Sequence, residues 1–277
     1  MLLGAARMLA SEGGFDGTVR FVFQPAEEWG RGAISMLDDG LMARLPFSEI
    51  YGIHNMPGIP IGRFATRTGS IMAAEDIFEI KLSGTGGHAA RPHQTNEVLI
   101  ATCALVVNLQ TIVSRRLDPA DMAVVSVTEL ITDGSRNALP GTATILGDAR
   151  SMRSEVSAEI ERRMRQIVDG TASTYGCSAS VDYRREFVPL INTPEETRVA
   201  LEAAASVFGA GPVDDDVVPI AASEDFARFL ERVPGDFAFV GNGVESHPHH
   251  NPNYDFNDQG LRFGANYFVG IARQRLR

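Results

Sequence analysis

Two adjacent glutamates, Glu27 and Glu28, are the sharpest chemical feature of the sequence. They follow residues 18–23, where β-branched and aromatic residues alternate as in a strand, and Pro25 ends that strand because proline cannot donate a ladder hydrogen bond. Open α/β sheets usually place their chemistry at the carboxyl ends of strands. One glutamate could therefore bind a cation while the other moves a proton. The alternative is a solvated pair of acids at the start of a helix over residues 32–42.

All six histidines fall in predicted loops or at predicted strand ends. His54 directly follows the apolar strand at residues 48–53, and His250 lies in a loop after the strand at residues 237–240. A carboxylate with neutral imidazoles makes a mixed nitrogen and oxygen site that suits Zn²⁺ or Mn²⁺. A second carboxylate beside such a site can take a proton from water that the ion has acidified. Any one histidine alone would more often be structural or merely exposed, so the prediction depends on their grouping.

Helix and strand patterns alternate over about the first 70 residues and again from residue 193. This alternation predicts a mostly parallel sheet with helices on its faces. Between the two stretches, the patterns follow the order βαββαβ of a ferredoxin-like, or split βαβ, unit. We therefore predict an α/β protein with a discontinuous first domain over residues 1–72 and 188–277 and an inserted domain over residues 73–187.

Composition excludes several classes of protein. The chain has 277 residues and is 44% hydrophobic, so it can bury a core, and its formal net charge of −10 disfavours nucleic-acid and anionic-membrane partners. No apolar run approaches the ~20 residues that cross a bilayer. Only Cys103 and Cys177 occur, which excludes a disulfide framework, predicts two buried thiols and favours a reducing, cytoplasmic setting.

Five separated motifs resemble those of the N-acyl-amino-acid amidohydrolases, a group of the metallo-aminoacylase superfamily that includes hippurate hydrolases and indole-acetyl-amino-acid hydrolases. They cover essentially the whole chain in the same order: Gln24-Pro25-Ala26-Glu27-Glu28, Gly52-Ile53-His54-Asn55, Gly86-Gly87-His88-Ala89-Ala90, Ser223-Glu224-Asp225-Phe226 and His250-Asn251-Pro252-Asn253-Tyr254-Asp255-Phe256. The resemblance implies a di-metal hydrolase that cleaves the amide bond of N-acyl amino acids or related small amides, with Zn²⁺ or Mn²⁺ as cofactor. It also implies that residues 73–187 form a lid through which two subunits make a homodimer. Dipeptides and carbamoyl amino acids stay open as alternative substrates.

The same resemblance assigns roles to residues of the first domain. Glu27 corresponds to the general base, and Glu28, His54 and His250 correspond to metal ligands. His250 is preferred to His249 because the family pattern places the histidine directly before Asn-Pro.

Three further residues of the inserted domain receive roles from the resemblance. His88 corresponds to a lid histidine that reaches the neighbouring subunit's active site and steadies the oxyanion. Asn137 corresponds to an asparagine near the substrate, and Arg150 to an arginine that holds the substrate carboxylate, which a guanidinium fork fits well. Without the resemblance, Arg150 would be interpreted as a surface charge at a strand end. Glu224 and Asp225 are expected to start a helix, with support of the metal ligands as the alternative.

One departure from the family pattern concerns the metal ligands. The family supplies two more ligands from a Cys-Gly-His-Asp-Gly-His segment, just upstream of the helix that residues 1–12 resemble, and this chain starts at that helix. Three protein ligands for a site built for two ions predict weak binding, with one or both ions absent. A catalytically impaired or inactive remnant is therefore the alternative to an active hydrolase.

Overall fold

The computed structural model describes residues 1–277, which divide into two compact units. The first unit is built from the N-terminal and C-terminal parts of the chain, and the second unit is built from the middle part. The first unit comprises Met1–Ile71, Leu190–Ile220 and Glu224–Arg277, and the second comprises Met72–Pro189 and Ala221–Ser223.

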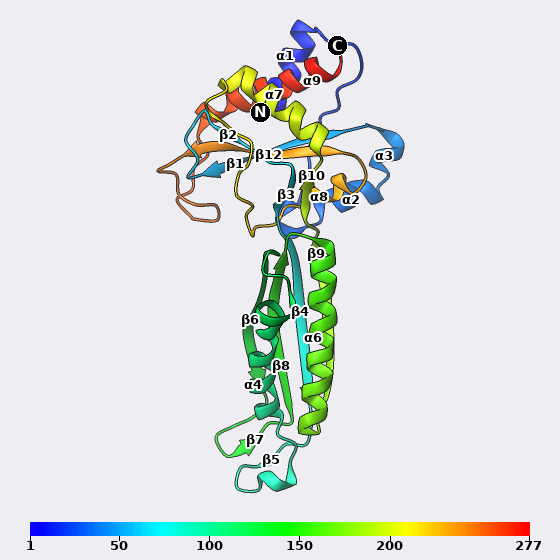
Figure 1. Cartoon of the computed structure of the whole chain (residues 1–277), viewed down its shortest axis with the longest axis vertical. Helices are drawn as coiled ribbons and strands as arrows, with labels where there is room; N and C mark the ends of the chain where they lie inside the picture. The colour runs from blue at the N-terminus through cyan, green and yellow to red at the C-terminus, as the bar shows by residue number, and fades with distance from the viewer. The chain divides into compact units, whose positions relative to one another are not determined.

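A mixed four-stranded sheet in the order β1-β12-β2-β11 forms the centre of the first unit (Figure 1). Strand β1 (Ile50–Pro57) pairs in parallel with β12 (Gly235–Gly243), β12 pairs antiparallel with the short β2 (Phe64–Ala65), and β2 pairs in parallel with β11 (Val213–Asp214). Two of the three pairings are therefore parallel. The chain has the α/β fold that the sequence predicts.

Helices cover this sheet and bury its central strand. The first eight residues of β12 are all buried, as expected for a strand with packed neighbours on both faces. The rings of Phe64 and Tyr267 pack at a tilt beside alanines of α7 in the core, and α9 packs against both α7 and α1. The remaining elements of this unit are α1 (Leu2–Glu12), η1 (Glu27–Trp29), α2 (Gly32–Asp38), α3 (Leu41–Arg44), β3 (Gly69–Met72), β10 (Leu190–Asn192), α7 (Pro194–Phe208), α8 (Ala227–Leu230), η3 (Asp258–Gly260) and α9 (Leu261–Arg275).

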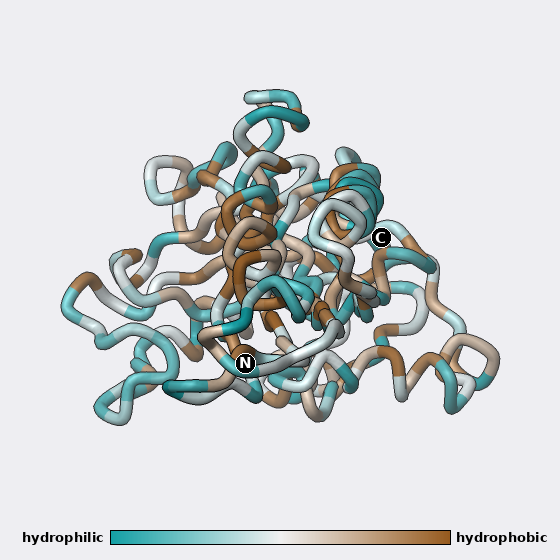
Figure 2. The backbone as a smooth tube through the Cα atoms, turned by 90° about the horizontal axis from the view of Figure 1, so that it is seen from below, coloured by the Kyte–Doolittle hydropathy of each residue, from teal (hydrophilic) through white to brown (hydrophobic).

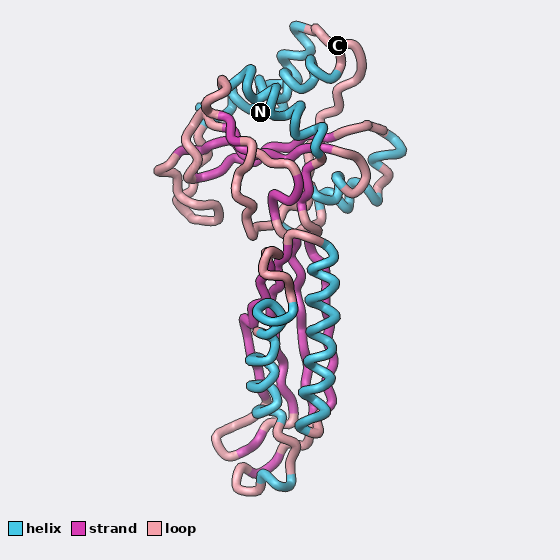
Figure 3. The backbone as a smooth tube through the Cα atoms, viewed as in Figure 1, coloured by secondary structure: helices cyan, strands magenta, loops and turns pink.

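The strand predicted at residues 18–23 is wrong. The structure has no strand between α1 and β1, and Figure 3 draws this stretch as a loop. Its alternating pattern is real, but no second strand pairs with it, so no hydrogen-bonded ladder forms. An apolar groove of about 940 Å³ is lined by this stretch, including Phe21, and by residues such as Ile53 of the edge strand β1 and Phe237 of β12.

The second unit has the predicted βαββαβ order. Its antiparallel sheet has the strand order β6-β8-β4-β9, and α4 and α6 lie side by side against it (Figure 1). This order is the ferredoxin-like arrangement, because the first and third strands of the unit lie at the centre. Its elements are β4 (Ala74–Ser83), β5 (Gly87–His88), η2 (Pro92–Gln94), α4 (Val98–Leu109), α5 (Thr111–Arg116), β6 (Ala123–Thr132), β7 (Ala138–Leu139), β8 (Thr142–Ser151), α6 (Ser154–Tyr175) and β9 (Ser178–Phe187).

Two periodicities build the core of the second unit. Buried apolar residues recur along α6 at the four-residue spacing of one helix face, from Val156 through Ile160 and Met164 to Val168. Strand β4 instead alternates buried and less buried residues, as a sheet with one covered face requires. Figure 2 colours each residue by its hydropathy and shows that hydrophobic and hydrophilic residues are interspersed along the backbone.

The prediction that both thiols are buried is wrong. Cys103 is exposed and Cys177 is half-buried, and both are free. Cys103 lies on α4, an apolar helix whose outer side no element of the structure covers, so its apolar surroundings in the sequence do not translate into burial. No helix combines the length and the apolar character that crossing a membrane would need.

Candidate metal centre and active site

The loop before α2 holds Glu27 and Glu28 in a single tight turn. Ala26 adopts a left-handed backbone with φ of 49°, and the amide of Gly30 donates to the carbonyl of Glu27 at 2.7 Å. This turn leaves Glu27 half-buried and Glu28 exposed. A non-glycine residue with positive φ is uncommon, and such strain is often found at functional sites. The two neighbouring carboxylates thus have different surroundings.

His54 extends from β1, where it is opposite Phe239 of β12. Its Nδ1 lies 2.7 Å from the carbonyl oxygen of Asn55. Because a carbonyl oxygen only accepts, this contact puts the proton on Nδ1 and leaves the Nε2 lone pair available to a ligand. Burial lowers the pKa of His54, which favours the neutral imidazole that a metal needs.

His250 and Glu28 face each other across a short gap. The Nε2 atom of His250 lies 3.8 Å from Oε2 of Glu28, and both side chains are exposed, at 76% and 69%. His250 is the second non-glycine residue with a left-handed backbone, with φ of 63°. Two ligand atoms of a tetrahedral zinc ion, each ~2.0–2.1 Å from the metal, lie ~3.3 Å apart. The observed gap is close to that separation.

His249, which sequence reasoning did not select as a ligand, packs against His54 instead. The two rings meet edge to face with centroids 4.8 Å apart, and Nε2 of His249 lies 2.9 Å from the carbonyl oxygen of Asn55. The Asn55 side chain also donates to the hydroxyl of Tyr254. These contacts attach the loop after β12 to the end of β1. The Asn-Pro that follows His250 favoured it over His249 as the ligand, but nothing in the sequence indicated that His249 packs against His54.

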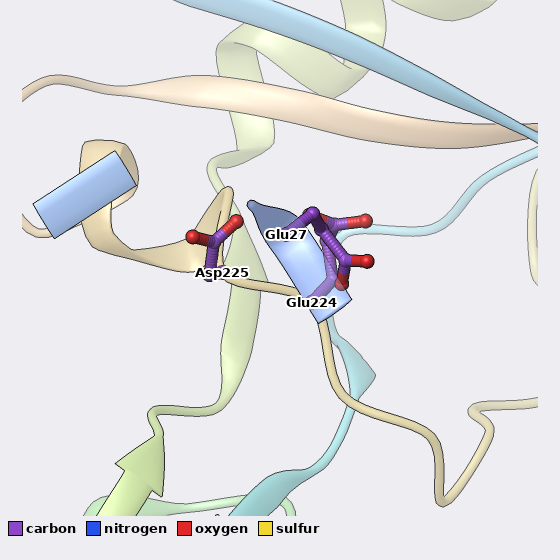
Figure 4. A group of neighbouring side chains, drawn as sticks. All are labelled: Glu27, Glu224 and Asp225. Carbon is purple, nitrogen blue, oxygen red and sulfur yellow. The ribbon is translucent and has the colours of Figure 1, made fainter. Parts of the chain in front are cut away.

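The structure contains one compact group of three potential metal ligands, and it differs from the predicted set. One carboxylate oxygen each from Glu27, Glu224 and Asp225 lie within 4.8 Å of one another. Figure 4 shows the Glu27 and Glu224 side chains next to each other, with Asp225 to one side. The sequence favoured a helix-starting role for Glu224 and Asp225, with support of the metal ligands as the alternative, and it did not predict that both lie beside Glu27.

Burial and mutual repulsion perturb these acids. Burial, followed by the charges of Glu28 and Asp225, raises the pKa of Glu27 to about 7. Burial and the charge of Glu27 raise the pKa of Glu224 to about 8. A carboxyl group with a pKa near neutrality is well suited to accept a proton in one step and return it in another.

The site residues predicted for the second unit lie at two places within it. The pairing of β5 with β7 sets His88 opposite Ala138, next to Asn137, and both predicted side chains are exposed. Nδ1 of His88 accepts from the amide of Ala90 at 3.1 Å. The structure therefore brings His88 and Asn137 together, and their roles stay predictions.

Arg150, on β8, is half-buried rather than a free surface charge. Its guanidinium contacts Glu75 at 2.9 Å, Asp148 at 2.8 Å and the hydroxyl of Ser223 at 2.7 Å. These partners orient the fork, and two of them are carboxylates of the kind it is predicted to bind in a substrate. The role of Arg150 in holding the substrate carboxylate stays a prediction.

The predicted ligands suit one divalent ion by their chemistry. Glu28, His54 and His250 supply one carboxylate and two imidazoles, and three protein ligands plus an open position are typical of catalytic zinc sites. Nε2 of His54 is available, and the gap between Glu28 and His250 is near the separation expected for two ligands of one ion. The assignment of these three residues as ligands stays a prediction.

Residues 1–274 match the peptidase family M20/M25/M40. The chain is 34% identical over 276 residues to the N-acetyl-L-cysteine deacetylase of Bacillus subtilis (strain 168), a match that covers 99% of this chain and 65% of that protein. It is 33% identical over 276 residues to the hippurate hydrolase of Campylobacter jejuni, covering 100% of this chain and 72% of that protein. The chain belongs to the peptidase family M20/M25/M40, which confirms the resemblance found in its motifs.

A solved structure supports the same assignment. The Bacillus subtilis YXEP protein, described as a dinuclear metal binding peptidase from the M20 family, superposes with a TM-score of 0.84 at 29% identity. That match covers 99% of this chain and 70% of the YXEP chain. The present chain thus spans about two thirds of the length of the relatives it matches, and its family includes proteins that bind two metal ions.

Proposed function

We propose that this protein is a metal-dependent hydrolase that cleaves the amide bond of N-acyl amino acids. The observation that carries the proposal is the grouping, within the first unit, of a half-buried Glu27 with the facing pair Glu28 and His250. His54 interacts electrostatically with Glu28 and with His250, and both interactions contribute to the pKa of His54. An acid that can exchange protons beside a set of metal ligands is the arrangement that metal-assisted hydrolysis requires.

The ligand chemistry suggests which ion binds and what it contributes. One carboxylate and two imidazoles suit Zn²⁺ or Mn²⁺. When bound, the ion polarises the carbonyl group of the substrate and acidifies water. Glu28, His54 and His250 would hold it, and Glu27 would accept the proton of the attacking water and return it to the leaving amine. Glu27 can do both only while it is not itself a ligand.

The substrate class follows from the named relatives. N-acetyl-L-cysteine and hippurate, after which two of them are named, are both amides of an amino acid that keeps a free carboxylate. We propose a substrate of this type. Dipeptides and carbamoyl amino acids share the same amide and carboxylate, so a panel of these compounds in the hydrolysis assay would establish the preference.

We also propose that residues of the second unit take part in the reaction. His88 would steady the oxyanion, Asn137 would lie near the substrate, and Arg150 would hold its carboxylate, as the resemblance implies. Arg150→Lys, which keeps the charge and loses the fork, should then raise KM more than it lowers kcat. His88→Ala should mainly lower kcat. An unchanged KM for the first variant would argue against a carboxylate site at Arg150.

We propose that the second unit, the predicted lid and dimerisation domain, forms a homodimer through its apolar outer surface. Helix α4 contains no charged residue, yet Ile100 and Val107 are 51% and 68% exposed. The edge strand β6 exposes Leu130 and Ile131 as well. A helix that is apolar on all sides is normally buried, so this surface favours a second copy as its cover.

Sedimentation of a matched pair of variants tests the homodimer. Val107→Asp should convert a dimer into a monomer, because it places charges in the interface. Val218→Asp, at a valine of the first unit that is 77% exposed, should leave the dimer intact. A wild-type chain that sediments as a monomer, or two variants that sediment alike, would contradict this surface.

The central test of the function is Glu27→Gln in the first unit. The variant keeps the size of the side chain and removes the proton acceptor, so it should retain metal and lose ~10²–10⁴-fold in turnover. Glu245→Gln, at an exposed glutamate, is the control and should keep full activity. Unchanged turnover in Glu27→Gln would reject the assignment of the base. A wild-type chain that holds no metal and hydrolyses no N-acyl amino acid would favour the inactive remnant.

A further inference from the structure

The loop that carries Glu27 and Glu28 has little structure of its own. The stretch before it forms no ladder, and the turn itself is a single 3-10 helix, η1. Two of its three internal backbone hydrogen bonds, from Trp29 and Arg31 to the carbonyl of Ala26, are long at 3.4 Å. Local contacts therefore do not suffice to fix the direction of the two glutamates. Contacts with the rest of the unit must contribute.

One buried carboxylate ties the two ends of this loop together. Oδ2 of Asp225 accepts from the backbone amide of Ala33 at 2.9 Å, and Oδ1 accepts from the side-chain amide of Gln24. Asp225 is only 1% exposed. Because Gln24 precedes the turn and Ala33 follows it, a single side chain from a distant part of the sequence closes the loop into a ring.

The two ends of the loop also touch each other directly. A Cβ atom added to Gly32 would lie 1.6 Å from the carbonyl oxygen of Pro25. Only glycine therefore permits this approach. The loop from Gln24 to Ala33, whose two ends are joined by Asp225, is therefore tightly closed. Its backbone has few alternative conformations in which to place Glu27 and Glu28.

We propose that Asp225, together with Gln24, is a positioning residue that holds the Glu27–Glu28 turn facing His250. This inference rests on the proposed function, because it assigns Glu28 to the metal and Glu27 to the proton. Both carboxylate oxygens of Asp225 are engaged, one by Gln24 and the other by Ala33, so Asp225 affects the metal through the turn. Residues that orient metal ligands typically change metal affinity ~10- to 100-fold when they are substituted.

The first measurement is hydrogen exchange, which requires neither metal nor activity. Asp225→Asn replaces one acceptor oxygen by a donor, so amides of residues 24–33 should exchange at least ~10-fold faster, an effect expected when a local opening is favoured. Asp76→Asn is the matched control: Asp76 is also 1% exposed but lies in the second unit. It should leave residues 24–33 unchanged. Equal exchange of these residues in both variants would overturn the positioning role.

The second measurement is Mn²⁺ binding by calorimetry in a double-mutant cycle. Asp225→Asn should weaken binding ~10- to 100-fold. The same substitution in a Glu28→Ala background should cause no further loss, because Asp225 would act through Glu28. Additive losses would show that Asp225 works by another route and would overturn the proposal. If the wild-type chain binds no Mn²⁺, the proposed function fails, and hydrogen exchange alone decides the positioning role.

A second variant covers the case in which Asp225→Asn does not fold. Gln24→Met keeps the length of a half-buried side chain and removes the donor to Asp225, together with the hydrogen bond of Gln24 to Glu224. Faster exchange confined to residues 24–33, with an unchanged melting temperature of the second unit, would support the role of the ring. Exchange at the wild-type rate would contradict it.

Discussion

A buried aspartate of the first unit offers a prediction whose magnitude follows from the structure. Asp236, in the second position of β12, is fully buried. Its Oδ1 accepts from the hydroxyl of Thr66 at 3.0 Å, while its Oδ2 has no hydrogen-bond partner. Burial, with a smaller effect from the charge of Glu196, raises its pKa from 3.8 to about 7. The buried hydroxyl of Tyr267 is the other titratable group that interacts with it.

This shift makes the stability of the first unit depend on pH. The raised pKa means that the folded state binds a proton that the unfolded chain releases above pH 3.8. The stability contribution of Asp236 is therefore complete below its unfolded pKa and is lost as the pH rises through about 7. A difference of about three pKa units corresponds to ~4 kcal/mol. Asp236→Asn removes the titration and leaves an acceptor for Thr66.

The difference in unfolding free energy between wild type and Asp236→Asn should thus shift by ~4 kcal/mol in favour of the variant between about pH 4 and about pH 8. Urea unfolding, combined with hydrogen exchange of β12, measures it for the first unit specifically, because two units need not unfold together. Asp215→Asn, at an exposed acid of the same unit, should show no such shift. A difference for Asp236→Asn that stays constant to within ~1 kcal/mol over this pH range would refute the reasoning.

Four further substitutions, in three comparisons, test the packing and the backbone. Gly32→Ala should lower the unfolding free energy by at least ~2 kcal/mol because its Cβ would collide with the carbonyl of Pro25, whereas Gly170→Ala, in an open position of α6, should raise it by ~1 kcal/mol. Urea titrations compare the two, and equal effects would contradict the close approach. Ile145→Ala should cost ~2–5 kcal/mol in the second unit, since this side chain is fully buried, and a smaller loss in thermal unfolding would mean that the core collapses around the gap. Ala26→Gly should stabilise the chain by ~1 kcal/mol by relieving its left-handed backbone, and calorimetric melting that shows a loss would argue against that conformation.

Local sequence patterns were sufficient to predict helices and strands that have one buried face, because buried residues then recur at a regular spacing along the chain. The four-residue spacing of α6 and the alternation of β4 are set by one covered face each, so the βαββαβ order of the second unit could be predicted from the sequence. The apolar strand that carries His54 could also be predicted, but β1 continues to Pro57, so His54 lies within the strand and not directly after it. Residues 18–23 show the limit of this reasoning. Their alternation is that of a strand, but a strand exists only when another segment pairs with it, and none does.

The sequence by itself determined the family, the α/β class and a set of candidate donors, because these depend on residue types in order. Only the tertiary structure decided which donors meet. Asp225 lies 192 residues from the amide it accepts from, and Glu224 lies even farther along the chain from Glu27, so no local pattern could join them. The different contacts of His249 and His250 likewise depend on how one loop meets the end of β1. Contacts between distant segments depend on how the whole unit packs, and this packing cannot be predicted from the residue spacing within any one motif.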